Sequence, residues 1–115
     1  MYNKFYESIS RDHPVNYRKA ERDALINAIK QLQAGIEIGP NSVETIKACA
    51  LMQKLWSIIL SDVINDGNKL PIELRASIIS IGIWIQKELT SITEGKSNNF
   101  TGIIEINQII ADGLA

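Results

Sequence analysis

The stretch that decides the fold runs from Pro71 to Thr93 and reads PIELRASIISIGIWIQKELTSIT. If its side chains step around a helix by about 100° per residue, its apolar residues fall on two separate faces. The first face holds Leu74, Ile78, Ile81, Ile85, Leu89 and Ile92, and the second holds Ile72, Ala76, Ile79 and Ile83. A surface helix needs only one apolar face. We therefore predict that this helix is covered on both sides, by its own core on one and by another helix, of this chain or of a partner, on the other.

Three further segments have the apolar periodicity of a helix. They cover about residues 14–34, 41–65 and 100–112. Gly35 and the pair Gly39-Pro40 are expected to end the first of them. Asn41 and Glu44 have the spacing of a capping box, so we expect the second to begin at Asn41.

The breaks between these segments are short, which favours helices that pack antiparallel to their neighbours in the chain. Gly95 and Gly113 are expected to end the third and fourth helices, and Gly82 is expected to let a neighbouring helix approach the third. The predicted fold is all-α. It is a single domain over residues 1–115, with a small antiparallel four-helix bundle at 14–112 and an N-terminal arm at 1–13.

The arm carries aromatic residues without a long apolar stripe. Tyr2, Phe5 and Tyr6 can share one face of a short helix. Exposed rings of this kind need a groove in which to lie. We therefore expect the arm to pack on the side of the bundle.

Composition excludes several classes of protein. Hydrophobic residues make up 45% of the 115 residues, which argues against disorder. The 12 basic and 13 acidic side chains nearly cancel, so the charge gives no general footprint for nucleic acid or acidic lipid. The single cysteine allows no internal disulfide. With no signal-peptide pattern and no apolar run of roughly 20 residues, we expect a soluble, cytoplasmic protein.

No pattern of residues indicates catalysis, a metal or a cofactor. His13 is the one histidine, and a lone histidine outside an acidic cluster is more often a surface or capping residue than a catalyst. Cys49 lies near an apolar stripe and is expected to be a buried small side chain. Asp62 and Asp66 are a helical turn apart, but nearby lysines favour a solvated face. We predict a protein that is not an enzyme and has no cofactor.

The two tryptophans have different surroundings in the sequence. Trp56 lies on the apolar stripe of the second helix. Trp84 lies in a seam between the two apolar faces of the third helix, where it could cover the edge of the core or anchor a partner. Core packing is the better interpretation for both, and Trp84 is kept as a candidate contact.

Several short sequences recur in the order and spacing of one known family. They are Leu70-Pro71, Leu74-Arg75, Ser80-Ile81-Gly82-Ile83-Trp84, Gly95, Ser97, Asn99-Phe100, Ile104-Glu105-Ile106-Asn107 and Asp112-Gly113-Leu114, with Gly39-Pro40, Lys54-Leu55-Trp56, Tyr2 and Tyr6 before them. In these residues the chain resembles the FlaF family of flagellin-biosynthesis regulators. The layout is also similar in architecture to the FliS type of flagellin export chaperone, from which no residue roles are carried over.

The resemblance implies a cytoplasmic protein that binds flagellin as a chaperone and supports its synthesis and export, alongside the regulator FlbT. Flagellin has terminal helices that are apolar on one side and need a cover before export, which a bundle with surplus apolar surface can supply. We expect a groove formed by the second face of the third helix, the last helix and the arm, with the arm in the groove when flagellin is absent. The candidate contact residues are Tyr2, Tyr6, Ile72, Ile79, Ile83, Trp84 and Phe100.

Three alternatives remain open. The protein could regulate translation of flagellin mRNA, directly or with FlbT, although acidic residues interrupt the basic run of the first helix. The second face could join two copies in a homodimer. It could also be the ordinary interior of a bundle, in which one helix contacts two neighbours.

Overall fold

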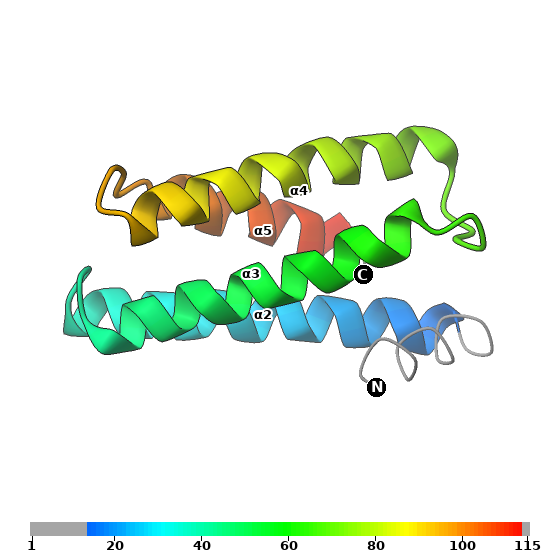
Figure 1. Cartoon of the computed structure of the whole chain (residues 1–115). Coiled ribbons are helices and arrows are strands. Elements are labelled where there is room, and N and C mark those ends of the chain that lie inside the picture. Colours follow the sequence, from blue (N-terminus) through cyan, green and yellow to red (C-terminus); the bar gives the residue numbers. More distant parts are fainter. Residues whose placement is uncertain (1–13, 114–115) are drawn as a thin grey trace.

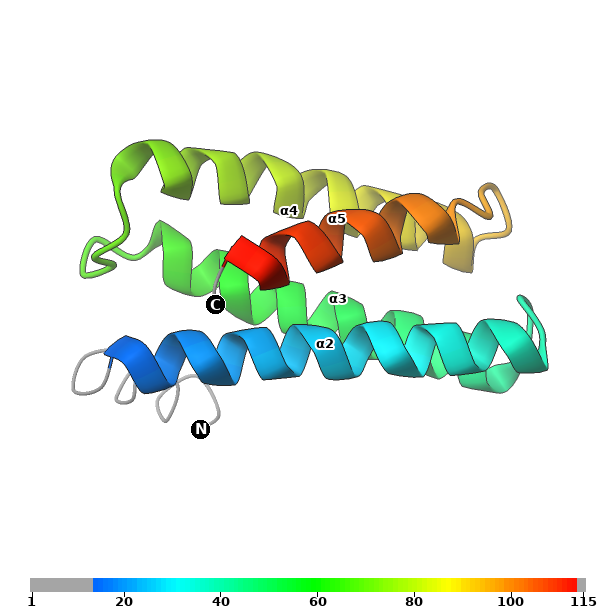
Figure 2. The same cartoon turned by 180° about the vertical axis from the view of Figure 1, so that it is seen from behind.

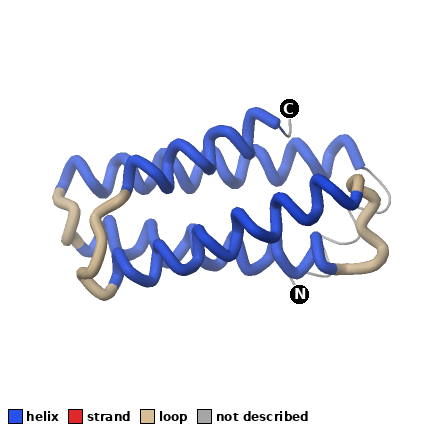
Figure 3. The backbone as a smooth tube through the Cα atoms, turned by 90° about the horizontal axis from the view of Figure 1, so that it is seen from above, coloured by secondary structure: helices blue, strands red, loops and turns tan. Residues whose placement is uncertain are grey.

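Four α-helices follow one another in the computed structural model, which describes residues 14–113 and the side chains from residue 19 to residue 113. They are α2 (Pro14–Ile38), α3 (Val43–Ile64), α4 (Ile72–Thr93) and α5 (Phe100–Gly113). Successive helices run in opposite directions, and their loops gather at the two ends of the bundle (Figures 1 and 3). The predicted all-α antiparallel four-helix bundle is therefore confirmed. The predicted arm, residues 1–13, lies outside the described residues.

The four helices do not share their contacts equally. α2 packs against α3 and α5, and α3 also packs against α4, whereas α4 and α5 touch each other only sparsely. Figure 1 shows α4 and α5 side by side above α3 and α2, and Figure 2 shows that α5 runs along only part of α4. At about 1.5 Å per residue, the 14 residues of α5 span about 21 Å and the 22 residues of α4 about 33 Å. The seam between α4 and α5 is consequently the least closed of the bundle.

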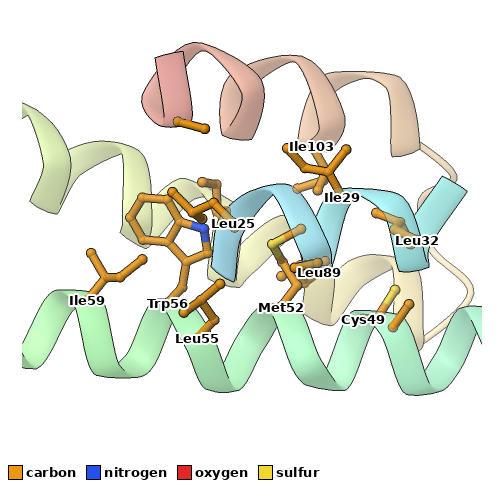
Figure 4. Packing of buried hydrophobic residues seen from close by; sticks show 14 of the residues in the cluster. Leu25, Ile29, Leu32, Cys49, Met52, Leu55, Trp56, Ile59, Leu89 and Ile103 are labelled. Carbon is orange, nitrogen blue, oxygen red and sulfur yellow. The ribbon is translucent and has the colours of Figure 1, made fainter. Parts of the chain in front are cut away.

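Trp56 of α3 occupies the centre of the core. Its side chain is fully buried, and it lies among apolar side chains such as Leu25 of α2 and Ile59 of α3 (Figure 4). The indole Nε1 donates a hydrogen bond of 2.7 Å to Oδ1 of Asn107 on α5. Asn107 in turn donates from Nδ2 to the carbonyl oxygen of Ile103, also at 2.7 Å. Both side chains bury their polar atoms with partners, which removes most of the cost of placing them in an apolar core.

Gly82 sets the distance between α4 and α3. A Cβ atom at this position would lie 2.9 Å from Cε3 of Trp56 and 2.6 Å from Cδ2 of Leu60. Both distances are below van der Waals contact, so only glycine lets the two helices approach this closely. The expectation that Gly82 permits a close helix approach is confirmed.

The turn between α2 and α3 differs from the prediction in two ways. α2 continues past Gly35 to Ile38, because Gly35 serves a tertiary contact: a Cβ there would lie 2.8 Å from the backbone nitrogen of Thr45. The cap of α3 is Ser42, whose Oγ accepts from the Thr45 backbone N–H at 3.2 Å, and the predicted capping box of Asn41 and Glu44 is wrong. Ser42 is preferred because its Oγ also donates to the Gly35 carbonyl, which ties the cap of α3 to α2.

The other helix ends form as their local sequence indicates. Gly95 has φ +74°, and the backbone N–H groups of Gly95 and Lys96 donate to the carbonyls of Ile92 and Ser91, the pattern of a Schellman motif. At the start of α5, Oδ1 of Asn99 accepts from the Gly102 N–H at 3.1 Å, as expected of a cap.

Arg75 caps α3 from the neighbouring helix. Its Nε donates to the carbonyl oxygen of Val63 at 2.9 Å, and its Nη2 reaches the carbonyl oxygens of Ile64 and Asn65 at 3.4 and 3.2 Å. A guanidinium at this position satisfies orphan carbonyls and complements the negative end of the helix dipole. Arg75 thereby fixes the start of α4 against the end of α3.

We predict that Gly82→Ala lowers the free energy of unfolding by about 1 kcal/mol, although alanine is the better helix former by a similar amount. The reason is overpacking against Trp56, which is fully buried and cannot move aside. Urea unfolding of the two proteins measures the difference. Ser80→Ala, at an exposed position of the same helix, is the control and should leave stability the same or slightly higher. A Gly82→Ala protein as stable as that control would contradict the close contact.

Candidate functional site

An open groove lies along the seam between α4 and α5. It is lined by Ser80, Ile81 and Trp84 from α4 and by Gly102, Glu105, Ile106 and Ile109 from α5. Its volume is about 440 Å³, and it opens to solvent along its length. The groove exists because α5 packs against α2 while α4 packs against α3, so that neither closes fully on the other.

The lining of the groove is mainly apolar. Trp84 of α4 and Ile109 of α5 are large lining side chains, with 41% and 63% of their surface exposed. Ser80 and Gly102 are small, which lets a backbone approach the groove closely. Glu105 is the one charged lining residue and forms no ion pair or hydrogen bond with any described residue. The groove thus combines an apolar strip with a free carboxylate on the α5 side.

Trp56 contacts both of the helices, α4 and α5, that form the walls of this groove. Its ring lies under Gly82 of α4, and its Nε1 binds Asn107 of α5. Ile81 precedes Gly82 by one residue and Ile106 precedes Asn107 by one, so each points about 100° away from the buried residue that follows it. The two isoleucines therefore reach the same opening from opposite walls.

Among the candidate residues that the structure describes, Trp84 alone lines the groove. The expectation that it packs in the core is wrong, because α5 leaves this side of α4 uncovered. Trp56, by contrast, is buried as expected. Phe100 is half-buried at the start of α5, against the core, and Tyr2 and Tyr6 lie outside the described residues.

The second face of α4 does not line the groove, which corrects the predicted surface. Ile81 and Ile83 lie about 100° to either side of Gly82, and since Ile81 faces α5, Ile83 must face the α3 side. Ile79 is half-buried there, and Gln86 on the same side donates to the backbone carbonyl of Gln53 in α3. No described helix of this chain covers this face, because Ile72 is 77% exposed and Ile83 47%, so the alternative that it is ordinary bundle interior does not hold for these two residues.

Sequence reasoning missed most of the groove residues. Ile81 falls on the first apolar face of α4 together with core residues, and neither Ile106 nor Glu105 of α5 is among the predicted contact residues. The available signal was Ile109, a large apolar residue that flanks the polar face of its helix and is 63% exposed.

The reactive side chains are placed for structure. Cys49 is buried as expected, and burial raises the pKa of its thiol, which keeps it protonated and unreactive at neutral pH. Oδ2 of Asp62 accepts a hydrogen bond from Asn68 in the turn after α3. Within residues 14–113 no three His, Cys, Asp or Glu side chains come together in a way that could hold a metal ion. None of the helices in this range is long and apolar enough to cross a membrane.

The family model described as "Flagellar protein FlaF" matches residues 2–114. This chain belongs to the FlaF family. The match covers all four helices and residues 2–13 before them, so the FlaF resemblance seen in the short sequence motifs holds along the chain. No curated protein and no solved structure matches this FlaF-family chain. It is a flagellar protein with an open apolar groove between α4 and α5.

The hydrogen bond between Trp56 and Asn107 should govern the position of α5, one wall of the groove. We predict that Asn107→Leu lowers the free energy of unfolding by about 1–2 kcal/mol, because it leaves the buried indole N–H without an acceptor. In a Trp56→Phe background, which has no such donor, the same change should cost about 1 kcal/mol less. Denaturant unfolding of the four proteins gives this coupling energy. Equal costs in both backgrounds would show that the bond does not hold α5.

Proposed function

We propose that this FlaF-family protein binds flagellin in the cytoplasm as a chaperone and supports its synthesis and export. The observation that carries the proposal is the apolar groove between α4 and α5, with Trp84 and Ile109 exposed at its walls. Membership of a flagellar family supports flagellin as the client, since the terminal helices of flagellin are apolar on one side and lack their partners before assembly.

The shape of the groove suits a helix better than an extended peptide. Its walls are two antiparallel helices, so a third helix can lie along them and place side chains at i, i+3 and i+4 between Trp84, Ile106 and Ile109. The exposed edge of a sheet, which an extended peptide would need for its backbone hydrogen bonds, is absent from the described residues. A helix that is apolar on one side is therefore the client structure that fits.

The free carboxylate of Glu105 adds a preference to this fit. A client helix that carries Lys or Arg beside its apolar stripe could pair with Glu105 at the edge of the groove. Because the pair would be exposed, its contribution is expected to be below about 1 kcal/mol and to weaken with salt. The apolar contacts, led by Trp84, would supply most of the affinity.

Control of flagellin mRNA, directly or with FlbT, is the alternative function. Its support among the described residues is small, because basic side chains are interleaved with acidic ones. Arg22 lies 3.7 Å from the carboxylate of Asp23, and Lys96 lies 3.4 Å from that of Glu94. A protein that binds RNA through its phosphates would need unpaired basic residues gathered on one face.

Trp84→Ala should weaken flagellin binding by about 2 kcal/mol, roughly 30-fold, since it removes the largest exposed apolar side chain of the groove. Isothermal titration of purified protein with monomeric flagellin measures the affinity. Ile38→Ala is the matched control. It removes a more exposed apolar side chain from the end of α2, outside the groove, and should bind like the wild type.

Two outcomes would contradict the proposed function. One is wild-type protein that shows no binding to flagellin at micromolar concentration. The other is a gel shift in which flagellin leader RNA binds at physiological salt and the Trp84→Ala protein retains full flagellin affinity. The first outcome removes flagellin as the client, and the second favours the mRNA alternative.

A further inference from the structure

A second groove lies between α2 and α3, apart from the groove between α4 and α5. It is lined by Ala24 and Asn27 of α2 and by Leu51, Lys54, Leu55 and Ile58 of α3, and its volume is about 230 Å³. We call it the α2–α3 groove. Its α3 residues have the i, i+3, i+4 and i+7 spacing of a helix stripe that packs against another segment.

The α2–α3 groove faces away from the rest of the bundle. Ile58 follows Trp56 by two residues, so it points about 160° away from that ring on α3. Trp56 contacts α4 and α5, and both of these helices lie on one side of α2 and α3 (Figure 1). No helix of the described residues therefore covers the α2–α3 groove, which leaves Leu51 and Ile58 at its walls half-buried.

The N-terminal arm, residues 1–13, is attached to one wall of this groove through Pro14 of α2. Ala24 lies ten residues after Pro14, about 15 Å along the helix. Phe5 precedes Pro14 by nine residues, which span about 14 Å as a helix and about 30 Å as an extended chain. Proline disfavours a helical conformation at the residue before it, so the arm is not expected to continue α2 in a straight line. The arm is therefore long enough to turn back along α2 and bring Phe5 to the groove.

The side chains of the arm suit the lining of the α2–α3 groove. Four of them have apolar surface that needs cover, namely Tyr2, Phe5, Tyr6 and Ile9. Leu51 and Ile58 offer aliphatic walls to these side chains. Asn27 and Lys54 make no hydrogen bond or ion pair with any described residue. The Asn27 amide can therefore bind a tyrosine hydroxyl, and the Lys54 ammonium can lie over a ring.

Covalent attachment favours the arm over a separate molecule at this site. A segment tethered by a few residues has an effective concentration on the order of millimolar. A second copy or a partner protein would have to reach a comparable concentration or bind much more tightly. The arm also reaches the α2–α3 groove directly. To reach the groove between α4 and α5 it would have to cross α5, which packs against α2 (Figure 2).

We propose that the arm packs into the α2–α3 groove through Phe5, Tyr6 and Ile9 and holds α2 and α3 together on their outer side. The groove between α4 and α5 then stays open when no partner is present, in contrast to the sequence-based expectation that the arm fills it. This inference does not depend on the proposed function, because the occupant is part of the same chain.

A spin label on the arm tests this placement in the full-length chain. Ser8→Cys places the label between Tyr6 and Ile9 without removing a proposed contact, and the native Cys49 is buried, which protects it from the reagent. The label broadens the NMR signals of amides close to it. We expect the amides of residues 24–27 and 51–58 to lose most of their intensity and those of residues 80–84 and 105–109 to keep theirs. Wild-type protein carried through the same labelling is the control.

Ala24→Phe in the labelled protein should abolish the broadening, because it fills the α2–α3 groove with a ring of the bundle itself. Ala34→Phe, at an exposed position further along α2, is the matched control and should keep the broadening. If Ala24→Phe unfolds at a lower temperature than Ala34→Phe, Ile58→Lys on the other wall replaces it. The control for that change is Ile46→Lys, at an exposed isoleucine of α3 outside the groove.

Each of three results would contradict this placement. Broadening at residues 80–84 and 105–109 instead would put the arm in the groove between α4 and α5. Broadening confined to the residues next to the arm in the chain, or unchanged by Ala24→Phe and Ile58→Lys, would show that the arm does not dock in the α2–α3 groove. Broadening that also appears in unlabelled, isotope-enriched protein mixed with labelled protein would assign the contact to a second copy.

Discussion

The bundle depends on the placement of one indole ring. Trp56 of α3 contacts α4 through the space that Gly82 leaves open, and it binds α5 through the hydrogen bond to Asn107. These two contacts fix α4 and α5 relative to α3 without fixing them tightly to each other. A larger residue at Gly82 would push α4 away, and an apolar residue at Asn107 would leave a buried donor unsatisfied. The open seam between α4 and α5 is therefore built into the core.

This arrangement explains why α4 has more apolar surface than the chain covers. Its buried side, with Ile78, Ile85 and Leu89, packs into the core. The flank toward α5 stays open because α5 is short and packs mainly on α2. On the flank toward α3, Arg75 and Gln86 of α4 donate hydrogen bonds to backbone carbonyls of α3. Ile72 and Ile83 lie outside these contacts and stay exposed. The same helix thus supports the fold with one side and leaves exposed apolar side chains on two further flanks.

The sequence could predict the structural features that depend on residues close together in the chain, but not those that depend on contacts between distant segments. The four helices and the end of α4 at Gly95 depend on residues within a turn or two, and the sequence was sufficient for them. Gly35 has the same local signature as a helix stop, yet α2 passes through it, because its role is contact with the backbone of Thr45 on α3. Contacts of this kind arise only when distant segments meet, and no local pattern encodes them.

The groove could not be predicted from the sequence, because it too depends on contacts between segments that are distant in the chain. Periodicity placed Ile81 on the same face as the buried Ile78 and Ile85, but whether it reaches the core or the groove depends on how α4 and α5 face each other, which Trp56 and Asn107 help to fix. That arrangement decides that Trp84 is exposed. The surplus of apolar surface on α4 could be predicted, whereas its division between two flanks required the positions of α3 and α5.

Quenching of tryptophan fluorescence by acrylamide tests the central claim most directly, because the chain has two tryptophans with opposite environments. Trp56 is inaccessible in the free protein, and Trp84 is 41% exposed in the groove. With a tryptophan-free helical segment of flagellin at saturation, the account predicts a blue-shifted emission and loss of the quenchable fraction, both from Trp84. A segment that binds while emission and quenching stay as in the free protein would contradict it.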